Sequence, residues 1–478
     1  MGRPAQLAPR LLLLLRLASV SLTSSSGGGG SSTSGAPASA AATAAGAEAS
    51  TWTHGWATAS EMTFADFNPN ALLTGAQARD VASKFRVVSL EKCSGVQNTT
   101  TEAAIYATAK QLKAIDPTLR VLFYLATDQQ GIHCYAAYTE FMAHPEWHLK
   151  LDNGTVYLGN GVPVLDPTVP AAAAWWAAVP LGGINGTGEF EGTPVSQLID
   201  GVLADSGGYS NTGGATESGA PGISTKRKEA IADAKRAMMG TLQKALTTAN
   251  GGIVMANGVS MYGAPNADPR YVNDTAKHHN LVALTEVDAI MGEHTGVFEC
   301  INSKNNSFNM ETVAQDLDAL IAAAKVDGGS KAVFVQTWPG MYTSTGFTPR
   351  GTTPAHVFPS YPGCKDCEPT PQSNDEWRDA LRRHFGFAQA MFLSIAEPNM
   401  YWMYAGYWYG SNTGYIACPE APESCAAPPE WYADLKKPLG APKGPRKLVS
   451  PYVWTREFEH ASVKLDLFDR NASLVTYH

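Results

Sequence analysis

Short apolar runs alternate with longer amphipathic stretches over most of this 478-residue chain, and this alternation limits the fold more than any other feature. Strands that are apolar throughout and joined by helix-length connections are typical of a parallel sheet covered by helices. The runs that we predict to be strands are residues 63–68, 86–91, 120–127, 198–205, 252–258, 287–293, 332–338 and 399–405.

The stretches between the runs have the periodicity of helices. In the longest, Ile231, Met238 and Leu242 return to one face, and charged side chains fill the others. Residues suited to N-terminal caps mark three helix starts, at Thr74, Asn309 and Asn374. The predicted helices are residues 74–83, 101–115, 138–144, 171–179, 225–248, 310–325 and 377–394.

Eight strand and helix units favour a sheet that closes on itself. An open doubly wound sheet is the competing topology, but no GxGxxG or Walker loop follows any early strand. We therefore predict an α/β fold of the (β/α)8 TIM barrel type.

The two ends of the chain differ from the barrel region. Basic residues, then apolar runs at 11–15 and 17–22, predict a signal peptide over residues 1–23, with a transit peptide as the alternative. Residues 24–51 are rich in Ser, Gly and Ala, which predicts a flexible linker. We assign residues 52–427 to a catalytic barrel domain. Residues 428–478 form a C-terminal segment, in which 452–458 and 462–467 are expected to pair as a β cap on the barrel.

Several features favour the secretory pathway and an extracellular location. Six Asn-X-Ser/Thr sequons suggest a glycoprotein, at Asn98, Asn153, Asn185, Asn273, Asn305 and Asn471. Of seven cysteines, Cys364 with Cys367 and Cys418 with Cys425 are predicted to form loop disulfides. A zinc site made by these four is the alternative, although the second pair lacks CxxC spacing.

Charge and hydropathy exclude two classes of partner. The formal net charge is −8 and no long Lys/Arg run occurs, so we expect no nucleic-acid partner. After the N-terminal segment, no stretch approaches the ~20 apolar residues of a membrane span, so we expect no membrane association in the mature form.

Polar residues that end apolar strands are candidates for a site, because the carboxyl ends of barrel strands converge on one face. Asp205 follows Gly-Val-Leu-Ala and Glu293 follows Ala-Ile-Met-Gly, where a carboxylate costs desolvation unless it is bonded or used. If Asp205 faces the barrel axis, Leu203 shares that face and Ala204 faces the helices. Further candidates, for substrate binding, are Glu91, Tyr124, Asp128, Asp166, Asn257, Gln336, Trp338, Trp402 and Tyr404.

Structural roles compete with each of these assignments. Asp205 could cap a following helix, Glu293 could pair with His294, and Glu91 followed by Lys92 favours a structural pair. Asp166 precedes an Ala-rich helix, where capping is the favoured role. By strand alternation, Glu91 and Lys92 are not expected to point inward together. His133 and Cys134 lack the partners that metal or thiol chemistry requires, so we predict no metal site.

The sequence resembles glycoside-hydrolase barrels, in particular the hypothetical glycosyl hydrolase-like family 15. The resemblance rests on LIDGVLAD at 198–205, VMANG at 254–258, VDAIMGE at 287–293 and the aromatic eighth strand. The resemblance extends to HPEW at 144–147, which precedes Asp166. It also includes the C-terminal tail, with LGAPKG at 439–444 and REFE at 456–459. In this tail Ala461 stands where the family motif usually has Gly. The resemblance implies a (β/α)8 barrel that acts on glycosidic bonds through Asp205 and Glu293.

Together these observations predict a glycosidase that acts on a carbohydrate substrate without a cofactor. Asp205 is the expected nucleophile or base and Glu293 the expected acid. The separation of the two carboxyl groups would decide between retention and inversion. A carbohydrate-binding barrel without catalysis is the alternative. A metal-dependent hydrolase or a Schiff-base lyase is disfavoured, because metal motifs are missing and no Lys ends strands four to seven.

Overall fold

The computed structural model describes residues 52–67, 72–93, 95, 99–128, 134–159, 161–183, 186–207, 222–258, 281–296, 301–302, 307–337, 367–369, 374–404 and 433–478. The predicted signal peptide and linker lie outside these residues.

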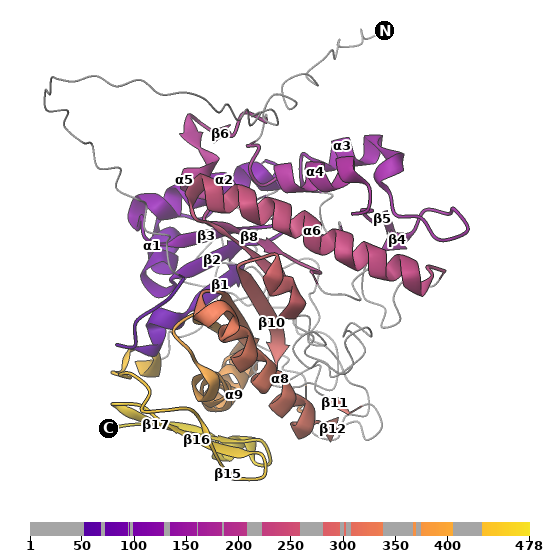
Figure 1. Cartoon of the computed structure of the whole chain (residues 1–478). Helices are drawn as coiled ribbons and strands as arrows, with labels where there is room; N and C mark the ends of the chain where they lie inside the picture. Colours follow the sequence, from indigo (N-terminus) through magenta and orange to yellow (C-terminus); the bar gives the residue numbers. More distant parts are fainter. Residues whose placement is uncertain are drawn as a thin grey trace, which may run out of the picture. The chain divides into compact units, whose positions relative to one another are not determined.

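Eight parallel strands form the central sheet (Figure 1). In spatial order they are β1 (Phe64–Phe67), β2 (Val87–Leu90), β3 (Arg120–Tyr124), β8 (Gly201–Ala204), β9 (Ile253–Asn257), β10 (Ala289–Thr295), β13 (Ala332–Thr337) and β14 (Met400–Tyr404). Spatial order follows chain order throughout, and a parallel bridge between Thr63 and Trp402 joins the last strand to the first. The sheet is therefore the predicted (β/α)8 barrel, because eight strands in sequential order close on themselves.

Helices connect the strands at the expected places. They are α1 (Gly75–Lys84), α2 (Thr101–Ile115), α3 (Tyr138–Ala143), α4 (Pro170–Ala178), α5 (Val195–Leu198), α6 (Thr225–Asn250), α8 (Met310–Ala324) and α9 (Asn374–Ile395). Thr74 caps α1 with a capping box and Asn309 caps α8, as predicted. The prediction for Asn374 was wrong by one position, since α9 already includes it. The fourth strand begins later than expected, because residues 195–198 form the short helix α5.

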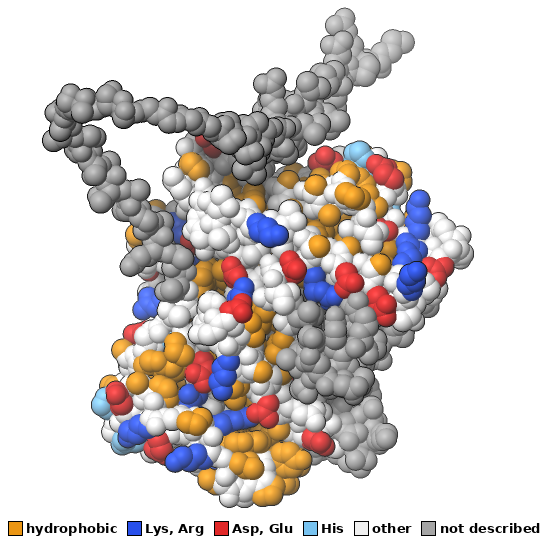
Figure 2. All heavy atoms as spheres, viewed as in Figure 1, with side chains coloured by type: hydrophobic (Ala, Val, Ile, Leu, Met, Phe, Trp, Pro, Cys, Tyr) orange, Lys and Arg blue, Asp and Glu red, His pale blue; other side chains and the backbone are white. Residues whose placement is uncertain are grey.

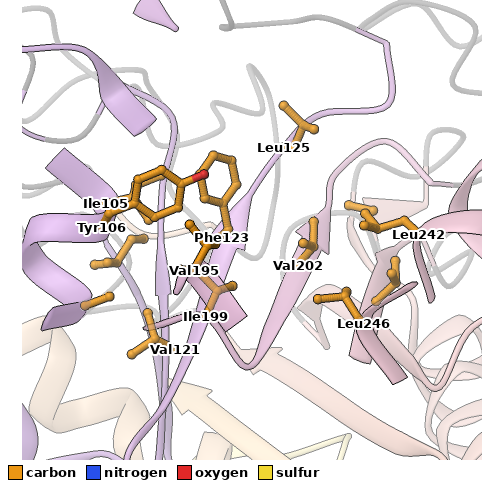
Figure 3. Close-up of a cluster of buried hydrophobic side chains, with 14 of the residues drawn as sticks. Ile105, Tyr106, Val121, Phe123, Leu125, Val195, Ile199, Val202, Leu242 and Leu246 are labelled. Carbon is orange, nitrogen blue, oxygen red and sulfur yellow. The ribbon is translucent and has the colours of Figure 1, made fainter. Parts of the chain in front are cut away.

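Strand alternation divides the core into an inner and an outer part. Leu203 and Met255 lie inside the barrel in one cluster with Trp52, which precedes the first strand. Val202 and Ala204 pack outward against the helices, so the alternation predicted for β8 is confirmed. Figure 3 shows this outer layer, where side chains of β3 and β8 meet those of α2, α5 and α6.

An antiparallel C-terminal sheet packs on α9. Its strands are β15 (Lys447–Ser450), β16 (Val453–Glu457), β17 (Ala461–Asp466) and β18 (Leu474–Tyr477), and the predicted pairing of 452–458 with 462–467 is the β16–β17 pair. Arg456 donates hydrogen bonds to the carbonyl oxygens of Leu393 and Ala396 at the end of α9, at 3.3 and 2.7 Å. This contact explains the Arg of the tail motif, because a cation at a helix C-terminus satisfies free carbonyl groups.

The surface carries mixed charges. On the face in Figure 2, Lys and Arg side chains lie among Asp and Glu side chains, and hydrophobic groups gather where Figure 1 draws the C-terminal sheet. Leu448 and Val449 of β15 and Phe468, in the connection between β17 and β18, are exposed. No helix in the described part of the chain is both long and apolar enough to cross a membrane.

A disulfide that the sequence did not suggest joins Cys93 to Cys134. It ties the segment after β2 to the segment after β3. Cys367 is also disulfide-bonded, but Cys364, Cys418 and Cys425 lie outside the described residues, so the predicted pairs remain predictions. The short hairpins β4–β5 (Leu158–Gly159, Val162–Pro163), β6–β7 (Glu189–Phe190, Thr193–Pro194) and β11–β12 (Ile301–Asn302, Ser307–Phe308) complete the described strands.

Candidate functional site

Two carboxylates meet on one amide at the carboxyl ends of neighbouring strands. Asp205 follows β8, Asn257 ends β9 and Glu293 lies near the end of β10. The side-chain nitrogen of Asn257 donates to Oδ1 of Asp205 at 2.8 Å and to Oε2 of Glu293 at 2.6 Å. The two carboxylate oxygens therefore lie no more than about 5.4 Å apart, the length of those two bonds placed end to end.

The alternation of side chains along each strand explains why these side chains converge. Leu203, Met255 and Met291 precede the three site residues by two positions and all lie in the barrel interior. Because side chains alternate along a strand, Asp205, Asn257 and Glu293 continue the same inward face. Asp205 and Glu293 are each half-buried, whereas Asn257 is buried.

Further donors hold the Asp205 carboxylate. The Tyr124 hydroxyl donates to Oδ2 at 2.5 Å, and the backbone N–H of Ser206 donates to Oδ1 at 2.7 Å. Burial, followed by the negative charges of Asp205 and Glu91, raises the pKa of Tyr124 well above its usual value. Tyr124 therefore keeps its proton at neutral pH and remains a donor to Asp205.

A lysine extends this network to the second strand. The Lys92 ammonium donates to Oε2 of Glu91 at 2.9 Å and to the Tyr124 hydroxyl at 3.2 Å. Burial lowers the pKa of Lys92, but the carboxylates of Glu91 and Asp205 raise it more, and the net shift is upward. The ammonium thus remains charged and links Glu91 to the Tyr124–Asp205 pair.

The expectation that Glu91 and Lys92 cannot both point inward was wrong. Strand β2 ends at Leu90, so strict alternation no longer applies at Lys92. Cys93 adopts a left-handed backbone conformation with φ of 60°. The chain turns there, and the long Lys92 side chain reaches the same side as Glu91.

Asp66 on β1 is a member of this group that the sequence reasoning missed. It is buried and continues the inward face of Phe64. Burial, then the charge of Glu91 and a hydrogen bond with it, raise the pKa of Asp66 well above its usual value. The signal that could have found it is an acidic residue in an otherwise apolar first strand.

The raised pKa of Asp66 predicts a pH effect on stability. A carboxyl group whose pKa is higher in the folded state stabilises the fold below its unfolded pKa of about 3.9, and this contribution is lost as pH rises through the folded value. We expect Asp66→Asn to be more stable than the wild type at pH 7, with the difference shrinking toward pH 4. Urea unfolding of both proteins at a series of pH values measures this difference in the free energy of unfolding. A difference that grows on acidification would contradict the assignment.

Other predicted site residues lie apart from this network. Trp402 and Tyr404 are buried on the outer side of β14, where both contact Phe385 of α9. Asp166 accepts hydrogen bonds from the backbone N–H and the hydroxyl of Thr168, and its carboxylate lies 3.6 Å from the guanidinium of Arg227. These contacts form a local turn, so Asp166 does not cap the following helix as expected. Trp402 and Tyr404 therefore pack as core residues, whereas the substrate-binding role predicted for Asp166 stays a prediction.

The remaining residues that the sequence analysis considered are buried, lie outside the described residues or belong to the disulfide. Gln336 is fully buried and continues the inward face of Phe334 on β13. Asp128 is buried after β3, near the ammonium of Lys235. Trp338 and His133 lie outside the described residues, as does the side chain of His294, while Cys134 is in the disulfide. Within the described ranges, no three His, Cys, Asp or Glu side chains are grouped to hold a metal ion.

No protein-family profile matches the sequence, and no curated protein matches it significantly. Among solved structures, an alpha-amylase from Anoxybacillus matches with a TM-score of 0.38 and 11% identity over 84% of each chain. An alpha-amylase from Geobacillus thermoleovorans, crystallised with acarbose, gives 0.37 and 11% over 86% of each chain. A glucosidase II alpha subunit gives 0.34 and 10% identity over 74% of this chain. The present chain spans only 32% of that subunit.

Proposed function

We propose that this protein is a retaining glycoside hydrolase with Asp205 as nucleophile and Glu293 as acid and base. One observation carries the proposal, namely the placement of both carboxylates on the single amide nitrogen of Asn257. Carboxyl groups are about 5 to 5.5 Å apart in retaining glycosidases and about 6.5 to 9.5 Å apart in inverting ones. An upper limit of about 5.4 Å between the bridged oxygens favours retention.

The two residues have different tasks in the proposed reaction. In the first step Glu293 protonates the glycosidic oxygen, the bond from that oxygen to the anomeric carbon breaks, and Asp205 forms an ester to the carbon. In the second step the Glu293 carboxylate takes a proton from water, and the water oxygen displaces Asp205. Two inversions at the anomeric carbon leave its configuration unchanged.

The contacts around Asp205 support its role as nucleophile. A nucleophile must be held at a fixed distance from the reacting carbon, and donors from Tyr124, Ser206 and Asn257 restrain both of its oxygens. The same donors receive the returning negative charge when the ester is cleaved. The motifs that resemble family 15 barrels lend further support, because they end at Asp205 and Glu293.

The stereochemistry of the product tests the proposal. We expect the purified mature protein to hydrolyse at least one member of a panel of aryl glycosides and polysaccharides. Proton NMR of the first sugar released should show the anomeric configuration of the substrate. An inverted first product would contradict the roles given to both residues. Binding of glycans by calorimetry without turnover would instead indicate a carbohydrate-binding barrel.

A further inference from the structure

The residue after Asp205 has an unfavourable backbone conformation. Ser206 lies in the left-handed region with φ of 57°, which costs a non-glycine residue of the order of 1–3 kcal/mol. Such a conformation persists only where surrounding contacts impose it. Because Ser206 directly follows Asp205 and its N–H binds Oδ1, the turn helps to set the direction of the carboxylate.

Contacts from the segment after β3 and from the end of β9 hold one side of this turn. The N–H of Thr127 donates to the carbonyl oxygen of Asp205 at 2.9 Å, and the Thr127 hydroxyl lies 2.8 Å from the carbonyl oxygen of Ser206. The N–H of Gly207 donates to the carbonyl oxygen of Asn257 at 2.7 Å. A Cβ at position 207 would lie 3.0 Å from that oxygen, so the backbone approaches β9 closely.

A buried lysine holds the other side. Lys235 lies on α6, is 3% exposed, and donates from Nζ to the carbonyl oxygen of Ser206 at 2.9 Å. The carboxylates of Asp128 and Asp205 attract its charge, and the guanidinium of Arg236 opposes it. Burial of an ammonium costs desolvation free energy, so a lysine at this buried position calls for a role that offsets this cost.

We propose that Lys235 is a positioning residue for Asp205. Its ammonium fixes the Ser206 carbonyl, which keeps the left-handed turn and thereby holds the Asp205 carboxylate between Tyr124 and Asn257. This inference rests on the proposed function for its effect on catalysis, whereas the geometric part stands without it. Loss of the ammonium frees the turn to relax and moves the carboxylate, and a displacement of about 1 Å can cost on the order of 100-fold in rate.

The test compares Lys235→Met, which keeps the stem and removes the charge, with Lys235→Arg, which keeps the charge. Lys244→Met, on an exposed position of the same helix, is the matched control. The direct readout is the pair of side-chain amide protons of Asn257 in a transverse-relaxation-optimised NMR spectrum, because this amide contacts both carboxylates. We expect Lys235→Met to shift this pair, and Lys235→Arg and Lys244→Met to leave it close to the wild-type position.

The pH dependence of the same signal gives a second readout. Burial lowers the pKa of Lys235 to about 8, against the carboxylates of Asp128 and Asp205, which raise it. The wild-type signal should therefore move as pH rises through about 8. This change should be absent in Lys235→Arg, since arginine does not deprotonate in this range. Should Lys235→Met fail to fold, as judged by circular dichroism, the titrations of the wild type and Lys235→Arg decide alone.

Kinetics complete the test. With a substrate from the panel, Lys235→Met should lower kcat at least tenfold and change KM by less than about threefold, with most activity restored in Lys235→Arg. An unchanged Asn257 signal together with an unchanged kcat in Lys235→Met would overturn the inference. If no glycoside is hydrolysed, the proposed function fails, but the NMR comparison still decides whether Lys235 positions Asp205.

Discussion

Asp205→Asn is expected to lower kcat on the order of 10⁴-fold, because an amide cannot form the ester to the anomeric carbon. Glu293→Gln should lower it by about 10²–10⁴-fold, since it removes proton transfer to the leaving group. The loss in Glu293→Gln should be smaller for aryl glycosides with acidic phenols, which depart without protonation. Initial rates on two aryl glycosides that differ only in the pKa of the phenol measure both effects.

The controls use the same chemical changes at exposed positions. Asp379→Asn on α9 and Glu311→Gln on α8 also replace a carboxylate by its amide, and both should keep wild-type rates. Azide should restore turnover in Asp205→Ala with an inverted glycosyl azide and in Glu293→Ala with a retained one. Hydrolysis that persists in both amide variants at near wild-type rates would remove these residues from the mechanism.

Loss of the Cys93–Cys134 disulfide is expected to have the largest effect on stability. The bond closes a loop with a sequence separation of 41, and the loop-entropy relation gives a stabilisation of about 4 kcal/mol. The double variant Cys93→Ser/Cys134→Ser should lose about that amount in denaturant unfolding. Because Cys93 follows Lys92, the variant should also lower kcat through a less fixed Lys92–Tyr124 contact.

Serine variants are preferable to a reducing agent, because Cys367 is also disulfide-bonded and would be reduced as well. Each single serine variant should match the double variant in stability, since either change breaks the same bond. Thiol counting by mass spectrometry before unfolding shows whether the bond has formed. A double variant within about 1 kcal/mol of the wild type would mean that this crosslink contributes little to the fold.

Much of the site could be predicted because its main members follow apolar runs. Asp205, Asn257 and Glu293 are polar residues after apolar strands, and alternation from Leu203 indicated which face Asp205 shares. In β14, alternation could not show which side chains face the barrel interior, because Tyr401, Trp402, Met403 and Tyr404 are all large and mainly apolar. Such a run carries no polar residue to mark the inner face, and the structure places Tyr401 and Met403 there.

The sequence by itself determined the eight strands, their parallel arrangement and two of the carboxylates, because hydrophobic periodicity is a local property of the chain. Only the tertiary structure placed Lys92, Lys235 and Asp66 beside them. Lys92 contacts Tyr124, and Lys235 contacts Ser206, although the members of each pair lie far apart in the sequence. The first contact depends on where β2 ends, and the second depends on how α6 packs. The same holds for the Cys93–Cys134 bond and for the bridge that the Asn257 amide makes between Asp205 and Glu293, since pairing between distant residues leaves no periodic trace in a single sequence.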